Sequence, residues 1–393
     1  MSPSIIGNTH SLFLASEAHI INSKNAEGNG LSNTLKSKNK NIRTTDYGEN
    51  RTNDWNIQIV WRNVVIFIIL HTLALYSIGL VLFGFYNWKT LLFTYIYTVF
   101  SGFGITAGAH RLWAHRTYKA NLPLRIFLML AQSAALQNDI HEWSRDHRVH
   151  HKFTDTNADP HNASRGFFFS HIGWLMCKKH KDVFEKGKTV DMSDVLGDPV
   201  VQFQIKYYIL LIIIMTLCIP TFIPWYFFGE TLWMSFVICM GRYVVSLNGT
   251  WLVNSAAHIW GNKPYERDIK PTENKSVSII AFGEGWHNYH HIFPWDYKAA
   301  ELGNYRLNFT TAFLDLMEKI GWATELKTAS KSMIRRRATR TGDGSWSVTE
   351  KIEETNMINA KDNHHLDSIW GWGDKDMKQT EANEIRKFNR IRA

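Results

Sequence analysis

Three dense clusters of histidine are the residues of this sequence with the clearest capacity for chemistry. They are His110-Arg-Leu-Trp-Ala-His115, His147-Arg-Val-His150-His151 and His287-Asn-Tyr-His290-His291. Positions i, i+3 and i+4 of an α-helix share one face, so each His-x-x-His-His cluster is expected to direct its imidazoles at one locus. Imidazole is a good ligand for iron, copper, zinc and nickel, so the clusters predict a metal site without naming the metal.

A ninth candidate ligand and a neighbouring amide lie at the end of the last long apolar segment. His258 stands four residues after Asn254 in the run Trp251-Leu-Val-Asn254-Ser-Ala-Ala-His258. On a helix these two side chains share a face, so we expect the Asn254 amide to reach a metal-bound water. The eight clustered imidazoles can divide four to each of two metal ions. A metal pair in a dry cavity suits the oxidation of an unactivated C–H bond by dioxygen, and we expect no catalytic residue separate from the ligands.

The other histidines have a plainer interpretation. His71 lies inside an apolar segment, where we expect a buried, hydrogen-bonded side chain. The remaining histidines lie outside the spacing of the clusters or in the terminal tails, and we expect them not to bind metal: His10, His19, His141, His161, His171, His180, His364 and His365.

Four apolar segments are long enough to cross a bilayer, and they separate the histidine clusters. They run over about 63–84, 91–108, 207–228 and 232–252. The turn within each pair is short, which predicts two helical hairpins. The apolar stretch 124–136 is too short to span a bilayer, and we expect it at the interface or packed on the bundle.

The polar sections complete the predicted architecture, an all-α integral membrane protein. Sections 109–206 and 255–340 carry most of the histidines and are expected to cap the bundle, within one unit over 55–340. Residues 1–54 and 341–393 are predicted to be flexible tails, because they are polar and show little periodicity. We expect no cleaved secretory signal at the start of the chain.

The distribution of charge predicts the side of the membrane on which the site lies. The net charge is +9, and the two hairpin turns hold one basic residue, Lys89. Since positively charged loops stay in the cytosol, both termini and every histidine cluster are expected there. Nucleic-acid binding is not expected, because no binding motif accompanies the charge. Cys177, Cys218 and Cys239 form no CxxC pair and are expected to be free thiols in a reduced compartment.

The residues around the clusters resemble those of the membrane-bound acyl-CoA desaturases of the stearoyl-CoA type. The matching runs are GITAGAHRLWAHR, RDHRVHHKFTDTNADPHNASRGFFFSHIGWL, TWLVNSAAH and GEGWHNYHHIFPWDY, and the likeness extends over about residues 55–345. The KAAELG and WGWGDKD segments resemble the insect branch. One departure is Ile140-His141, where that family has an aromatic residue; it leaves the candidate ligands untouched but can alter the approach to the substrate tunnel.

The resemblance implies a location and a cofactor. It implies four transmembrane helices capped by a cytosolic domain in the endoplasmic reticulum membrane, with a kinked tunnel for an acyl chain. It also implies two iron ions, with electrons delivered by cytochrome b5 and its NADH-dependent reductase. The implied ligands are His110, His115, His147, His150, His151, His258, His287, His290 and His291, with Asn254 acting through water.

The resemblance further implies a fatty acyl-CoA substrate. The positions that match the CoA-binding groups of the family are Asn63, Asn138, Arg145, Asp146, Lys178, Lys179 and Trp251. Adjacent ammonium groups at 178 and 179 suit the phosphates of CoA. The implied reaction uses O₂ to insert a cis double bond, by family default at Δ9 of C16–C18 chains. Δ11 and other positions remain open, as does a membrane di-iron hydroxylase.

The second apolar segment is expected to gauge the length of the acyl chain. Thr94, Tyr97 and Thr98 precede His110 by more than two helical turns, so they lie deeper in the bundle than the predicted metals. A chain bent at the metals would send its methyl end past them. The alternative is that these side chains face lipid.

Overall fold

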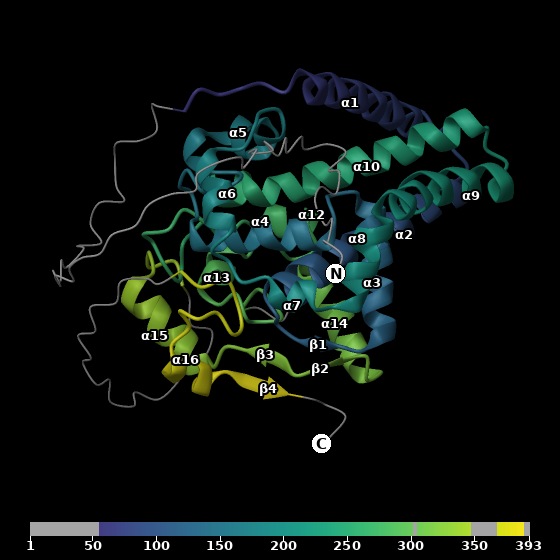
Figure 1. Cartoon of the computed structure of the whole chain (residues 1–393). Helices are drawn as coiled ribbons and strands as arrows, with labels where there is room; N and C mark the ends of the chain where they lie inside the picture. Colours follow the sequence, from purple (N-terminus) through teal and green to yellow (C-terminus); the bar gives the residue numbers. More distant parts are fainter. Residues whose placement is uncertain (1–54, 302–304, 347–367, 389–393) are drawn as a thin grey trace, which may run out of the picture.

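The computed structural model describes residues 55–301, 305–346 and 368–388, which form a mainly helical molecule (Figure 1). The predicted tail 1–54 lies outside the described residues. Within them, four helices are long and apolar enough to cross a membrane: Trp61–Leu82, Trp88–Ala114, Pro199–Phe228 and Leu232–Ile259. The predicted all-α fold with four membrane helices is therefore confirmed.

The membrane helices reverse direction at a common end. Helix α1 (Trp61–Leu82) lies along α10 (Leu232–Asn254), with which it makes its most extensive contact. The two hairpin turns touch, because the Glu230 carboxylate accepts hydrogen bonds from the Asn87 amide at 2.9 Å and the Thr90 hydroxyl at 2.8 Å. The opposite ends of the four helices therefore point together toward the histidine-bearing part of the chain.

The second membrane helix continues further than the sequence predicted. Helix α2 (Trp88–Phe103) passes without a break into a π-helix, η1 (Gly104–Ala114), so His110 lies inside the helix instead of beyond its end at 108. Small residues make this possible: a Cβ at Gly104 would lie 2.1 Å from the Gln132 backbone nitrogen. Glycine thus lets η1 press against helix α3, and π-helical turns are frequent where function requires a side chain to be re-aimed.

The third membrane helix starts earlier than the sequence predicted. It consists of α8 (Pro199–Ile212), a π-helical stretch η4 (Ile213–Cys218) and α9 (Ile219–Phe228). The side chain of Asp198 accepts from the Val200 amide and Pro199 occupies the first turn, a strong helix start. The predicted start at 207 coincides with a kink, where Tyr207 has φ −111° and ψ 20°. Polar residues of the first turns lowered the apolar signal without ending the helix.

The short apolar stretch after the second membrane helix packs on the bundle. Helix α3 (Leu122–Ala135) contacts η1, α2 and α8. Its Leu124 and Leu128 are fully buried in a core that also holds Trp113 and Leu314. Helix α3 therefore supports η1, the helical segment that carries His110.

Short elements build the rest of the described chain. The helices are α4 (Ile140–Lys152), α5 (Phe167–His171), α6 (Lys181–Gly187), α7 (Ser193–Leu196), α11 (Ala256–Ile259), α12 (Lys275–Ile280), α13 (His287–Ile292), α14 (Phe309–Lys319), α15 (Lys331–Thr341) and α16 (Gln379–Glu384), with 3₁₀ turns η2 (Ala163–Arg165), η3 (Gly173–Leu175) and η5 (Tyr305–Leu307). Strand β1 (Lys119–Ala120) pairs antiparallel with β2 (Ala323–Thr324), and β3 (Leu326–Thr328) pairs antiparallel with β4 (Arg386–Phe388).

The end of the chain differs from the flexible tail predicted over 341–393. Residues 368–388 pack on the domain: Trp370 is 3% exposed, and β4 pairs with β3. The prediction is wrong for this segment, because a polar average concealed a few aromatic and glycine residues that form specific contacts. Of the tail, residues 347–367 and 389–393 lie outside the described residues.

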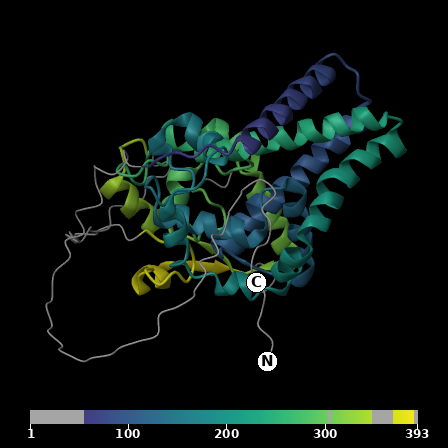
Figure 2. The same ribbon diagram turned by 45° about the horizontal axis from the view of Figure 1, so that its top comes forward.

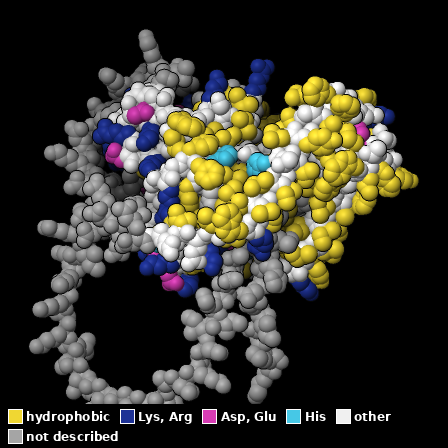
Figure 3. Space-filling view, turned by 90° about the horizontal axis from the view of Figure 1, so that it is seen from above, with side chains coloured by type: hydrophobic (Ala, Val, Ile, Leu, Met, Phe, Trp, Pro, Cys, Tyr) yellow, Lys and Arg dark blue, Asp and Glu magenta, His cyan; other side chains and the backbone are white. Residues whose placement is uncertain are grey.

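The surface separates into an apolar and a charged part. Figure 2 shows the long helices projecting together from the rest of the described chain. Figure 3 shows apolar side chains over most of this projecting part, whereas lysine and arginine gather mainly on the remainder. Large exposed apolar residues along α1 and α2 include Ile68, Leu75, Leu82, Leu92 and Ile96. Such a continuous belt suits helices surrounded by lipid.

Candidate metal centre

All nine predicted histidine ligands come together, and they form two adjacent groups. The five-histidine group consists of His110, His115, His147, His151 and His290, and the four-histidine group of His150, His258, His287 and His291. Within each group the ring nitrogens lie within 4.8 Å of one another. Apart from the half-buried His147 and His291, these side chains are buried. The structure therefore brings all nine side chains together, in two adjacent groups.

Each helical cluster serves both groups, which the sequence did not indicate. On α4, His147 and His151 point to the five-histidine group while His150 points to the other. On α13, His290 belongs to the first group and His287 to the second. The expectation that each cluster directs its imidazoles at one locus is thus wrong in detail. The histidine-bearing faces of α4 and α13 each lie between the two groups and contribute to both.

The imidazoles face each other through their Nε2 atoms. These atoms lie 2.9 Å apart between His110 and His290, and 2.8 Å apart between His115 and His147. In the four-histidine group the corresponding distances are 3.0 Å between His258 and His287, and 3.2 Å between His150 and His291.

The opposite edge of several rings contacts an acceptor that fixes the tautomer. The Nδ1 atoms of His110, His150 and His258 lie 2.9, 2.9 and 3.1 Å from carboxylate oxygens. The acceptors are Glu284, Asp159 and Asp155. A ring that donates from Nδ1 carries a lone pair on Nε2. Lone pairs turned toward a common point at such short separation repel unless a cation lies among them, so the donor set fits metal ions.

These carboxylates are functional residues that the sequence reasoning missed. Arg111 also donates to Glu284, at 2.8 and 3.2 Å. Burial alone would raise the pKa of Glu284, but Arg111 and His110 outweigh it and lower that pKa. The signal in the sequence was proximity: Asp155 and Asp159 closely follow the second cluster, and Glu284 precedes the third. Carboxylates of this kind typically orient metal-binding histidines.

Burial keeps most of these imidazoles neutral. Desolvation, with repulsion from neighbouring imidazoles, holds the pKa well below 6.5 for six of them: His115, His147, His151, His287, His290 and His291. Burial also acts on His150, but the Asp159 carboxylate outweighs it and raises the pKa of His150. Neutral imidazole is the form that binds metal.

An apolar cavity adjoins both histidine groups. It is lined by His110 and His147 of the first group, His150 and His287 of the second, and the half-buried Asn254. Its walls come from η1, α10 and α12 through Ile105, Val245, Gly249, Val253 and Ile280, and Thr98 of α2 lies deeper along it. Of the other residues predicted to gauge an acyl chain, Tyr97 is buried with its hydroxyl bonded to the Met215 carbonyl oxygen, and Thr94 is half-buried without lining the cavity.

Three of the predicted CoA contacts form one ionic cluster. Arg145 Nη2 lies 2.7 Å from Asp146, which also bonds Lys179, and Glu142 lies 3.5 Å from Arg145. Lys178, the residue before Lys179 on the same loop, is exposed. Lys179 and the start of α4 therefore lie together on one side of the domain.

The other predicted CoA contacts surround this side less directly. Asn63 is buried at the start of α1 and donates to the Leu175 carbonyl oxygen at 2.8 Å. Asn138 has a positive φ of 67° and is half-buried. Trp251 is 3% exposed and packs edge-on against Phe67, so its ring belongs to the core between α1 and α10.

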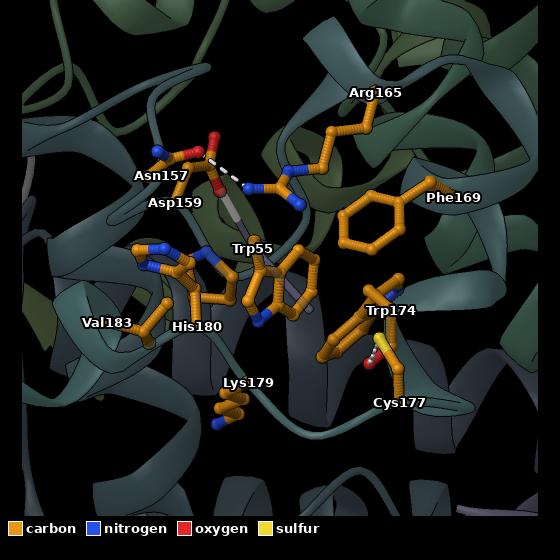
Figure 4. A pocket seen from close by; sticks show the side chains of 11 residues that line it. Trp55, Asn157, Asp159, Arg165, Phe169, Trp174, Cys177, Lys179, His180 and Val183 are labelled. Carbon is orange, nitrogen blue, oxygen red and sulfur yellow. Dashed lines mark hydrogen bonds between the residues drawn. The ribbon is translucent and has the colours of Figure 1, made fainter. Parts of the chain in front are cut away.

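A second hollow lies beside the ionic cluster (Figure 4). Its lining includes Trp55, Asp159, Arg165, Lys179 and His180. The Arg165 guanidinium lies 4.0 Å from the Trp55 ring centroid. Asp159 connects this hollow with the centre, because its carboxylate also accepts from His150.

The remaining histidines within the described residues have other partners. His71 is half-buried, and its Nδ1 donates to the Phe67 carbonyl oxygen at 2.8 Å. His171 lies 3.0 Å from the Ser255 hydroxyl. His161 is the exception, because its ring nitrogen lies within 4.8 Å of ligand atoms of His150 and Asp159, and the three form a third candidate group. His141 and His180 lie outside every such group among the described residues, and the terminal histidines 10, 19, 364 and 365 are not described.

The structure combines helices that can span a membrane with nine histidines that face two points beside an apolar cavity. This combination is typical of polytopic membrane oxidoreductases whose metal centre is held by histidines. The chain belongs to the fatty acid desaturase family, whose model matches residues 86–307. Desaturases are oxidoreductases, so this protein is an enzyme of that class.

Three relatives illustrate the similarity. The chain is 57% identical to an acyl-CoA Delta-9 desaturase of Acheta domesticus, over 82% of this chain and 84% of the relative. It is 57% identical to stearoyl-CoA desaturase 5 of Bos taurus, over 73% and 85%. It is 50% identical to an acyl-CoA Delta(11) desaturase of Trichoplusia ni, over 85% and 90%.

Proposed function

We propose that this enzyme uses O₂ to introduce a cis double bond into the chain of a saturated fatty acyl-CoA. The observation that carries the proposal is the apolar cavity flanked by histidines of both groups. A hydrocarbon chain has no group that a polar site could hold, so it must be oriented by shape along an apolar wall. The names of the relatives, acyl-CoA desaturases of the Delta-9 and Delta(11) types, support the substrate class.

The nine histidines would hold two iron ions, and this iron pair would supply the oxidising power needed for an unactivated C–H bond. Asn254 lines the same cavity and would orient a water at the centre. The cavity walls would hold two adjacent methylenes beside the centre and exclude bulk water. Electrons would come from cytochrome b5 and its NADH-dependent reductase.

The CoA head group would bind outside the cavity, on the side of the ionic cluster. Lys178, Lys179 and Arg145 would attract its phosphates, with Asn63, Asn138, Asp146 and Trp251 shaping the approach. In the structure Asp146 and Glu142 lie against Arg145 and Lys179, so the bound phosphates would compete with carboxylates for these two cations. Such competition weakens binding of the head group and thereby favours its release after each turnover.

The double bond would lie at Δ9 of a C16–C18 chain. Sequence identity supports this choice, since the chain is 57% identical to the Delta-9 relative of Acheta domesticus and 50% identical to the Delta(11) relative of Trichoplusia ni. The alternative is Δ11 or another position. The enzyme would reside in the endoplasmic reticulum membrane with both termini and the histidine centre in the cytosol, because the basic residues lie on the histidine side of the spans.

Expression in a yeast strain that lacks its own desaturase tests the proposal. Growth without added unsaturated fatty acid, together with a cis-9 double bond located by mass spectrometry, is the expected result. A His290→Ala variant is the control for activity of the host. A double bond at another carbon would refute the Δ9 position but leave the desaturation reaction in place. Alcohols in place of olefins would identify a hydroxylase.

A further inference from the structure

The segment 368–376, which we call the C-terminal strap, contacts the backbone and the ring of one candidate ligand. The Trp370 carbonyl oxygen bonds His115 Nδ1, and the Trp372 amide donates to the His115 carbonyl oxygen at 3.0 Å. Between them, Gly371 has a φ of +155°, and a Cβ there would lie 2.6 Å from the His115 carbonyl oxygen. No residue other than glycine fits at this position, so the close contact between the strap and His115 requires Gly371.

The strap is anchored to the helix that carries the second histidine cluster. The Trp370 ring lies under the Arg148 guanidinium, with 3.9 Å between the guanidinium carbon and the ring centroid. The buried Asp374 accepts from the Trp370 amide at 2.8 Å and lies 2.8 Å from Lys152 Nζ. Both Arg148 and Lys152 belong to α4, so this anchoring fixes the strap relative to the cluster on that helix.

A second attachment lies further along the chain. Strand β4 pairs with β3, and the Lys327 amide of β3 donates to the Thr117 carbonyl oxygen at 3.0 Å. Thr117 is two residues after His115. The strap and its neighbouring strand therefore hold the loop after η1 from two sides.

Few other hydrogen bonds restrain the rings of the five-histidine group. Within the described residues, the Nδ1 atoms of His151 and His290 have no hydrogen-bond partner. His110 is held by Glu284, and His115 by the strap. A carbonyl oxygen can only accept, so its bond places the proton of His115 on Nδ1 and leaves the Nε2 lone pair directed at His147, 2.8 Å away.

We propose that the C-terminal strap is a positioning element for metal binding, which fixes the tautomer and orientation of His115 and thereby completes the five-histidine group. The inference rests on the proposed dimetal function. Outer contacts of this kind typically change metal affinity by about 10–100-fold. Without the strap, the metal at the five-histidine group is lost first, while the four-histidine group retains its own.

Three variants of the full-length protein test this proposal through the metal content of the purified protein. Asp374→Ala removes the acceptor that holds Trp370, whereas Asp376→Ala, the matched control, removes only a second contact of Lys152. We expect Asp374→Ala to hold about half the metal of the unmodified protein, and Asp376→Ala to hold all of it. Asp374→Asn keeps an acceptor oxygen and should restore the metal, which general destabilisation would not produce.

Two further readouts separate positioning from folding. The metal-free proteins should unfold at similar temperatures, and the visible absorption of cobalt-loaded Asp374→Ala should lose the bands of one site only. If Asp374→Ala does not accumulate in cells, Gly371→Ala is the test variant in its place, and Gly344→Ala is its matched control. Gly344 also has a positive φ, of +88°, but has open space around it. Both changes therefore strain the backbone, and only the first displaces His115.

Full metal content in Asp374→Ala or Gly371→Ala overturns the proposal, as does equal loss in a variant and its control. An unmodified protein that binds no metal would instead refute the dimetal function itself. The two failures are distinguishable because the second appears before any variant is made.

Discussion

The two histidine groups are built alike at their centres and differently at their outer edges. In the four-histidine group, His150 and His258 bond carboxylates, Asp159 and Asp155, that belong to the loop directly after α4. In the five-histidine group, His110 bonds Glu284, whose charge is shared with Arg111. His115 bonds a neutral carbonyl oxygen from near the end of the chain.

This contrast separates two functions of an outer contact. A carboxylate both orients an imidazole and makes it a more basic ligand, whereas a carbonyl mainly orients it. Arg111 offsets much of the effect of Glu284. We therefore expect the carboxylate-bonded imidazoles of the four-histidine group to be the more basic ligands, so that two identical ions held here would not be equivalent.

The largest expected effect comes from removing a ligand. His150→Ala should lower desaturation by more than about 100-fold, since an inner ligand matters more than the outer contacts. His161→Ala is the matched control, because His161 also contacts Asp159 and packs against the His150 ring but does not belong to the four-histidine group. Fatty acid analysis of yeast expressing each variant measures the effect, with membrane insertion checked by fractionation. Full activity of His150→Ala would refute its assignment as a ligand.

A smaller effect should distinguish the two outer shells. Asp159→Asn and Glu284→Gln each keep an acceptor but remove a charge. We expect metal affinity to fall by about 10–100-fold in Asp159→Asn and by less in Glu284→Gln, where Arg111 already offsets the charge. Competition with a chelator measures both. Equal losses would mean that orientation alone matters and that the two groups do not differ in basicity.

A third test contrasts the histidine end of the cavity with its deep end. Thr98→Trp should shift preference from C18 toward shorter chains by about tenfold, because a pocket discriminates methylenes sterically. Turnover of short chains should persist, since both histidine groups are unchanged. Ile96→Trp is the control on the same helix, because Ile96 is 55% exposed on the lipid-facing side. A flat chain-length profile in Thr98→Trp would place the methyl end elsewhere.

The smallest expected effect is a difference in pH dependence. Burial lowers the pKa of four members of the five-histidine group, His115, His147, His151 and His290. They are already neutral before metal binds. Asp159 raises the pKa of His150, so metal must displace a proton there as the pH falls through that value. Affinity should then fall by at most about tenfold per pH unit, at the four-histidine group only.

Calorimetric titration in two buffers of different ionisation enthalpy measures the released proton. Asp159→Asn should abolish the release, because it removes the charge that retains the proton. Equal proton release from both groups would contradict the assigned difference between them.

The sequence alone determined the candidate ligands and the membrane helices. Both are encoded locally: the spacing His147, His150 and His151 requires only one helix, and an apolar run signals a span regardless of its neighbours. Local signals failed at helix ends. The first turns of α8 contain Gln202, Gln204 and Lys206, which lower the apolar signal without ending the helix. The segment η1 continues through His110 because Gly104 permits close packing that hydropathy does not register.

Only the tertiary structure decided which histidines share a locus and what holds them. His110 meets His290, 180 residues further along the chain, and His115 meets Trp370, 255 residues further. No periodicity relates such positions, since their distance depends on how separate helices pack. The sequence could therefore supply nine imidazoles, but their division into five and four, the carboxylates behind them and the strap over His115 arise from packing, which fixes positions to within the length of a hydrogen bond.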